Sequence, residues 1–308
     1  MSRSRLIVPV VFWLALVGAL IALWLSGQAA GAWDHVRSAH RLPLLAVIAC
    51  GIALPLVHAV RWCVLMDALD AEVPIGLAAD VTVSSSLVNY AGPGFLGAPA
   101  KAFLANRAAG APYGKTILSM AFEQGLDFLV LLVGSVCALL VIGPQPFMDA
   151  FAGYGHTARI ALIVGAIALI AIVVLIGRER MRRGIARIRE AFAAIGSRID
   201  RPAVAWCTAT LWLLQAAVIA SLLWALGMSL SLTAVLSLST IPLLLGQVVP
   251  LPGGLGVREA AMVALAVPVG MSSGELLGFA ILQRVLLVVA LPVALLAVRI
   301  ARRIGVVA

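Results

Sequence analysis

Long apolar stretches separated by short polar segments run through the whole chain. Most of them hold about 20 apolar residues, the length that an α-helix needs to cross the hydrocarbon core of a bilayer. This pattern predicts an all-α, polytopic helical membrane protein with six spans. The predicted spans are Leu6–Leu25, Pro43–Met66, Ile117–Ile142, Ile160–Ile176, Ala203–Leu226 and Leu276–Val298.

Two further apolar regions, Val81–Ala108 and Leu230–Gly270, are interrupted near their middle by proline and glycine. Irregular backbone at membrane depth is tolerated only where protein buries it or where it lines a cavity. We therefore expect both regions to form re-entrant hairpins made of broken helices.

The two interruptions share a sequence pattern, because Pro93–Gly97 and Pro252–Gly256 both read Pro-Gly-X-Leu-Gly. An odd number of predicted spans lies between them, so the hairpins would enter the membrane from opposite sides, as in the inverted repeats of many transporters. We expect one integral membrane domain, residues 1–308, with repeat-like halves at about 43–142 and 203–299. The alternative is a coincidental match, since glycine and proline are common in membrane helices.

Composition supports a membrane protein, with 63% hydrophobic and only 11% charged residues, against about 25% charged in soluble domains. The longest strongly polar stretch, Arg178–Arg201, is shorter than the ~50 residues of a small folding domain. We expect no attached soluble catalytic domain. Leu6–Leu25 resembles the apolar core of a signal peptide, but such cores hold ~7–15 residues, so an uncleaved first helix is favoured.

The net charge of +9 comes from 22 basic against 13 acidic residues. Most of the basic residues fall at predicted span ends on one side, which the positive-inside rule assigns to the cytoplasm. Both termini are then cytoplasmic, and the basic excess reflects membrane topology rather than binding of nucleic acid.

The polar stretch Arg178–Arg201 carries apolar residues at spacings of three and four among eight arginines. This periodicity predicts an amphipathic helix at the cytoplasmic surface, with its arginines near anionic lipid headgroups. A helix that binds a partner protein is the alternative.

Motifs of enzymes and metal sites are missing from the sequence. It contains no HExxH, GxSxG, Walker or GxGxxG motif, and its four cysteines show no CxxC spacing. We expect a protein that is not an enzyme and that has no metal or other cofactor.

Charged residues inside the predicted spans are few, and each is costly in hydrocarbon. Glu123 and Asp127 stand four residues apart, on one helical face. Arg284 lies at a similar depth in the last span and is predicted to pair with one or both carboxylates. The group is then either a structural ion pair or a site that contacts a charged headgroup or carries a coupling proton.

The second hairpin places Gly253, Gly254, Arg258 and Glu259 where a short helix begins. Glycines allow close approach of a ligand, and a helix N-terminus and an arginine favour an anion such as phosphate. The first hairpin supplies Asn89 and Lys101 in a similar arrangement. The alternatives are that Glu259 is only a first-turn helix charge and that Lys101 is a snorkelling end-anchor, which for Lys101 is the favoured interpretation.

The run Pro250–Ala261, followed by Gln283-Arg284, resembles the motif of the lysylphosphatidylglycerol synthase transmembrane, or flippase-like, family. Arg61-Trp62, Asn89 with the segment to Lys101, and Glu123 with Asp127 match the family pattern in order. The resemblance implies movement of polar or amphipathic lipids across the bacterial inner membrane. The synthase half of the fused members has no counterpart in these 308 residues, so lysyl transfer is not expected.

Three functions remain open from the sequence. The main hypothesis is a lipid translocase whose hairpins form a midplane cavity, with substrate contacts from Asn89, Lys101, Glu123, Asp127, Gly253, Gly254, Arg258, Glu259 and Arg284. The second is a subunit or remnant of a lipid-modifying enzyme. The third is a scaffold that binds a biosynthetic enzyme partner through the Arg178–Arg201 helix.

Overall fold

The computed structural model describes residues 39–91, 97–145, 198–248 and 256–305, together with residues 189, 193, 196 and 254. Every regular element in these ranges is a helix, which confirms the predicted all-α class. The helices are α3 (Arg41–Asp67), α4 (Ile75–Ala91), α5 (Gly97–Ala109), α6 (Tyr113–Ile142), α9 (Arg201–Ala225), α10 (Leu232–Val248), α11 (Val257–Ala264) and α12 (Ser273–Arg303).

Four of these helices, α3, α6, α9 and α12, are long and apolar enough to cross a membrane. The shortest of them, α9, has 25 residues, or ~37 Å at 1.5 Å per residue, against a hydrocarbon core of ~30 Å. They coincide with four of the six predicted spans. The other two predicted spans and most of the predicted amphipathic helix lie outside the described residues.

Both predicted interruptions are confirmed as breaks between helices. Helix α4 ends at Ala91 and α5 begins at Gly97, while α10 ends at Val248 and α11 begins at Val257. The two helices of each broken pair pack against each other. The order of a long helix, a broken pair and a long helix thus occurs twice, as an inverted repeat requires; the symmetry between the halves stays a prediction.

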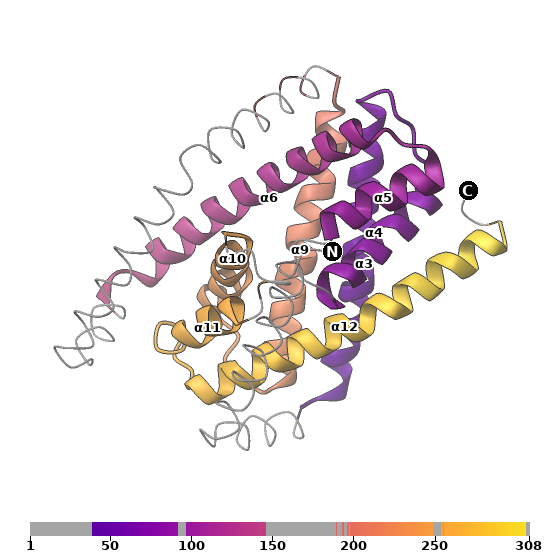
Figure 1. The fold of residues 1–308 in the computed structure, drawn as a ribbon. Helices are drawn as coiled ribbons and strands as arrows, with labels where there is room; N and C mark the ends of the chain where they lie inside the picture. The colour runs from indigo at the N-terminus through magenta and orange to yellow at the C-terminus, as the bar shows by residue number, and fades with distance from the viewer. Residues whose placement is uncertain are drawn as a thin grey trace, which may run out of the picture.

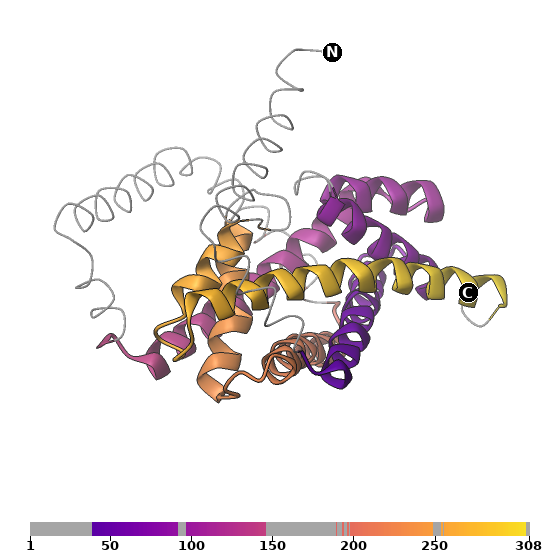
Figure 2. The same ribbon diagram turned by 90° about the horizontal axis from the view of Figure 1, so that it is seen from below.

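The helices form one bundle in which α9 lies beside α3 and α10 packs against α6 (Figure 1). Helix α12 contacts α11, α3 and α4, and Figure 2 shows it running across the whole bundle. The largest apolar cluster joins α9, α10, α11 and α12 around fully buried Leu222, Leu238 and Phe279. This packing brings the second broken pair against the two long helices that flank it.

Local sequence explains where two of the long helices begin. The side chain of Asp200 accepts a hydrogen bond from the backbone N–H of Ala203, and Pro202 stands in the first turn of α9. Ser272 and Glu275 form a reciprocal capping box at the start of α12. Side-chain acceptors at these positions satisfy backbone donors that a helix N-terminus leaves unpaired.

Candidate functional site

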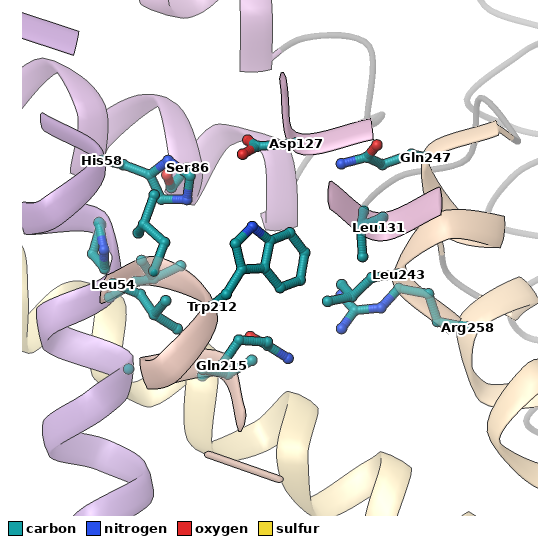
Figure 3. Close-up of a pocket in the computed structure, with 15 residues that line it drawn as sticks. Leu54, His58, Ser86, Asp127, Leu131, Trp212, Gln215, Leu243, Gln247 and Arg258 are labelled. Atoms are coloured by element: carbon teal, nitrogen blue, oxygen red, sulfur yellow. The ribbon is translucent and has the colours of Figure 1, made fainter. Parts of the chain in front are cut away.

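A cavity of about 250 Å³ lies inside the bundle, and every described helix except α5 contributes to its wall. Most of the wall is apolar, with leucines from α3, α6, α9, α10 and α12. Seven lining side chains carry a polar group and come from six helices (Figure 3): His58, Ser86, Asp127, Trp212, Gln215, Gln247 and Arg258.

Behind one side of the cavity wall, Arg61 of α3 is fully buried and bound to the carboxylates of α6. Its two terminal nitrogens donate to the two oxygens of Asp127 at 2.7 and 2.8 Å, and its Nε lies 3.6 Å from Glu123. Such a bidentate pair is the strongest geometry for a guanidinium and a carboxylate. The negative charge of Asp127 is therefore neutralised before any ligand enters the cavity.

The second carboxylate of α6, Glu123, is held by the first broken pair. The Nζ of Lys101 lies 3.0 Å from Glu123 Oε2 and 4.5 Å from the centre of the Trp62 ring. The snorkelling interpretation of Lys101 is wrong, because the residue is only 8% exposed. Two basic and two acidic side chains thus form a neutral buried network that joins α3, α5 and α6.

The predicted pairing of Arg284 with Glu123 or Asp127 is also wrong. Arg284 instead pairs with Glu259, with 2.6 Å between Arg284 Nη2 and Glu259 Oε1. The reason is helix packing: α12 lies against α11, whereas the carboxylates of α6 face α3 and α5. The similar predicted depths of Arg284 and the α6 carboxylates were therefore not enough to place them in contact.

Glu259 also closes the N-terminus of α11. Its second oxygen accepts the backbone N–H of Gly256 at 2.7 Å, and Gly256 has a positive φ of 79° that favours glycine. Glu259 is thus a first-turn helix charge and an ion-pair partner at once. Its neighbour Arg258 contributes instead to the wall of the cavity.

Arg258 reaches the cavity between two glycines. A Cβ atom on Gly246 would lie 2.6 Å from Arg258 Cγ, and one on Gly254 would lie 2.8 Å from Arg258 Cδ. These distances are too short for any side chain, so both glycines leave room for the stem of this arginine. In Figure 3 the guanidinium extends from α11 toward the space that Trp212 and Gln215 line from the opposite side.

Several polar atoms around this space are buried without a hydrogen-bond partner in the described part of the chain. They are Arg258 Nε, Trp212 Nε1 and Gln215 Nε2, and Gln215 is only 9% exposed. No ion pair with Arg258 occurs among the described residues. Because buried polar groups are normally hydrogen-bonded, the three donors indicate a place for an acceptor-rich ligand.

Comparison with known families agrees with the sequence motifs. The family described as the lysylphosphatidylglycerol synthase TM region matches residues 11–295. The chain belongs to this family. No curated protein and no solved structure matches it significantly. The family match and the apolar helices together show a membrane protein of the flippase-like family.

In this member of the lysylphosphatidylglycerol synthase TM family, the predicted site residues divide into separate groups. Asp127 and Arg258 line the cavity, while Lys101 and Glu123 lie in the buried network behind it. Glu259 and Arg284 pair at its edge, beside Arg258. Asn89 packs against Gly97, since a Cβ atom on Gly97 would lie 2.8 Å from the Asn89 Cβ. Gly254 contacts the stem of Arg258. Gly253 lies outside the described residues.

The sequence prediction missed three residues that complete this family member's site: Arg61, Trp212 and Gln215. Arg61 entered the sequence analysis only as part of the family pattern, although its apolar flanks from Leu54 to Met66 also indicate a buried position. Gln215 stands in the middle of an apolar span, where a polar side chain normally faces a cavity or another helix. Both signals were present in the sequence.

Proposed function

We propose that this protein moves a lipid with an anionic headgroup across the bacterial inner membrane, with the headgroup passing through the cavity and the tail remaining in lipid. A headgroup that crosses hydrocarbon unaided loses several kcal/mol for each unpaired polar group. A translocase has to supply substitute hydrogen-bond partners on the way. The polar side chains around this cavity are suited to that role.

The environment of Arg258 is the main support for this proposal. Its guanidinium faces a cavity with mainly apolar walls, and Asp127, the one carboxylate among the described lining residues, is already bound to Arg61. A charge in such surroundings is unfavourable unless a counter-charge joins it. An anionic headgroup is the ligand that would supply it.

The cavity volume favours a headgroup over a whole lipid. At about 250 Å³ it lies below the ~300–1,000 Å³ of pockets that enclose drug-sized molecules. In this proposal the protein is a transporter and not an enzyme. Both of its termini lie in the cytoplasm, and its cytoplasmic surface contacts anionic lipids. A biosynthetic enzyme that supplies the lipid is the proposed partner.

Reconstitution into vesicles tests this function. Phosphatidylglycerol labelled on an acyl chain is followed as it becomes accessible to a quencher that cannot cross the membrane. The intact protein should accelerate movement over protein-free vesicles, and Arg258→Gln should lose most of that acceleration. Arg303→Gln, at the exposed end of α12, is the matched control and should keep it. Equal rates with Arg258→Gln would remove Arg258 from the path, and no acceleration by the intact protein would reject the translocase.

A further inference from the structure

The charges around the cavity favour one class of lipid headgroup. This inference rests on the proposed function. Asp127 is bound to Arg61, Glu123 to Lys101 and Arg61, and Glu259 to Arg284. No carboxylate in or beside the described cavity wall is left to receive a cation. The two interrupting segments, residues 92–96 and 249–256, contain no acidic residue either.

The basic side chains around the cavity, in contrast, outnumber their acidic partners by one among the described residues. Arg61 and Lys101 balance Glu123 and Asp127, and Arg284 balances Glu259, so that among the described residues Arg258 is the one charge of the site without an acidic partner. The site therefore presents one uncompensated positive charge, which one negative charge would balance. A phosphodiester carries one negative charge and offers oxygens that a guanidinium can bind as a fork.

The remaining donors indicate what accompanies the phosphate. Within the described ranges, Trp212 Nε1 and Gln215 Nε2 are buried without a hydrogen-bond partner. Indole N–H is only a donor, so Trp212 requires an acceptor from the ligand. His58, which also lines the cavity, offers a further donor. Its Nδ1 lies 3.3 Å from Arg61 Nη2 and must accept, because a guanidinium nitrogen only donates. The hydrogen of the neutral imidazole is therefore on the other ring nitrogen. Neutral hydroxyl oxygens satisfy such donors, whereas an ammonium group, which only donates, leaves them unpaired.

We propose that the cavity selects phosphodiester lipids whose headgroups carry neutral hydroxyl groups, and that it rejects aminoacylated, cationic headgroups. Arg258 binds the phosphate, and Trp212 and Gln215 bind the hydroxyl oxygens. The selectivity comes from carboxylates that the protein itself neutralises. Arg61, Lys101 and Arg284 therefore determine specificity without contacting the lipid.

Binding in detergent measures this selectivity independently of transport. The probes are phosphatidylglycerol, lysyl-phosphatidylglycerol and phosphatidylmethanol, a phosphodiester without free hydroxyls, each titrated onto the full chain and followed by native mass spectrometry. Phosphatidylglycerol should bind at least tenfold more tightly than the lysyl lipid and several-fold more tightly than phosphatidylmethanol. Arg258→Gln should abolish the preference over the lysyl lipid, whereas Arg303→Gln should preserve it.

Two controls separate charge from bulk and lipid from soluble ligand. The lysyl lipid acetylated on both nitrogens keeps the bulk without the charge, so it should bind more tightly than the lysyl lipid itself. Glycerophosphoglycerol, the same headgroup without acyl chains, should compete weakly. Equal binding of the two lysyl lipids would overturn selection by charge, and strong competition by glycerophosphoglycerol would reassign the cavity to a soluble phosphodiester.

The same titration distinguishes this inference from the proposed function. A preference for phosphatidylglycerol that depends on Arg258, without any movement in vesicles, would reject the translocase and keep the selective site. Equal or tighter binding of lysyl-phosphatidylglycerol would overturn the inference whether or not the protein moves lipid. Equal binding of phosphatidylmethanol would remove the hydroxyl contacts of Trp212 and Gln215.

Discussion

Replacing Asp127 by asparagine tests how strongly the buried Arg61–Asp127 pair stabilises the bundle. Asparagine has nearly the same shape, so the change removes a charge without creating a cavity. Arg61, which is fully buried, keeps its contacts with neutral Thr208 and His58, but its one remaining carboxylate among the described residues is Glu123, at 3.6 Å and shared with Lys101. The buried network then changes from neutral to a charge of +1. Breaking a buried pair in this way destabilises a protein by ~3–5 kcal/mol.

The assay is a titration of the protein in mixed micelles with a denaturing detergent, which gives the free energy of unfolding. The matched control is Asp70→Asn, because Asp70 pairs with Arg198 at the surface, where the side chains are 74% and 61% exposed; such pairs contribute about 1 kcal/mol or less. Adding Arg61→Met to Asp127→Asn should recover part of the loss, since no unpaired charge remains in the network. A loss for Asp127→Asn no larger than that for Asp70→Asn would mean that the buried Arg61–Asp127 pair stabilises the protein no more than a surface pair does.

Three other changes probe packing around the site. Gly246→Ala should push Arg258 out of place, because the new Cβ would lie 2.6 Å from its Cγ, and should lower vesicle transport several-fold without loss of insertion. Gly114→Ala, with open space around it, should leave transport unchanged. Gly134→Ala would bring a methyl group to 2.7 Å from Thr240 Cγ2 and should cost ~1–3 kcal/mol of unfolding free energy; adding Thr240→Ser, which deletes that methyl, should restore it. Trp62→Phe removes the 2.9 Å hydrogen bond to Ser119 and should cost ~1–3 kcal/mol in the same titration.

Each packing prediction has an opposite outcome that would contradict it. Equal transport by Gly246→Ala and the intact protein would mean that the stem of Arg258 does not need the glycine. Failure of Thr240→Ser to rescue Gly134→Ala would place the clash elsewhere. An unchanged unfolding free energy in Trp62→Phe would show that the buried indole hydrogen bond contributes nothing.

The sequence was sufficient to predict the four described helices that are long and apolar enough to span a membrane, and the two places where helices break. Span length depends only on bilayer thickness, so the run Ile117–Ile142 matched α6 with a difference of four residues at its start. Proline lacks a backbone donor and glycine has no Cβ, so Pro-Gly clusters marked both breaks. Helix α12 extends beyond its predicted end at Val298, because arginines are favourable in a last helical turn.

The ion pairs could not be predicted in the same way. Depth along a span is one coordinate, whereas contact also depends on which helices are neighbours and how each is rotated. Arg284 and Asp127 have similar predicted depths, but Arg284 faces α11 and Asp127 faces α3. Arg258 was identified from the sequence because its neighbours Gly254 and Gly256 made the motif specific.

An experimental structure of the protein in nanodiscs that contain phosphatidylglycerol would show whether a lipid headgroup enters the cavity. We expect a lipid phosphate inside the cavity, ~2.7–2.9 Å from the guanidinium of Arg258, with the acyl chains outside and Asp127 still bound to Arg61. A structure in which Arg258 binds a carboxylate of the protein, and lipid phosphates lie only at the ends of the helices, would contradict it.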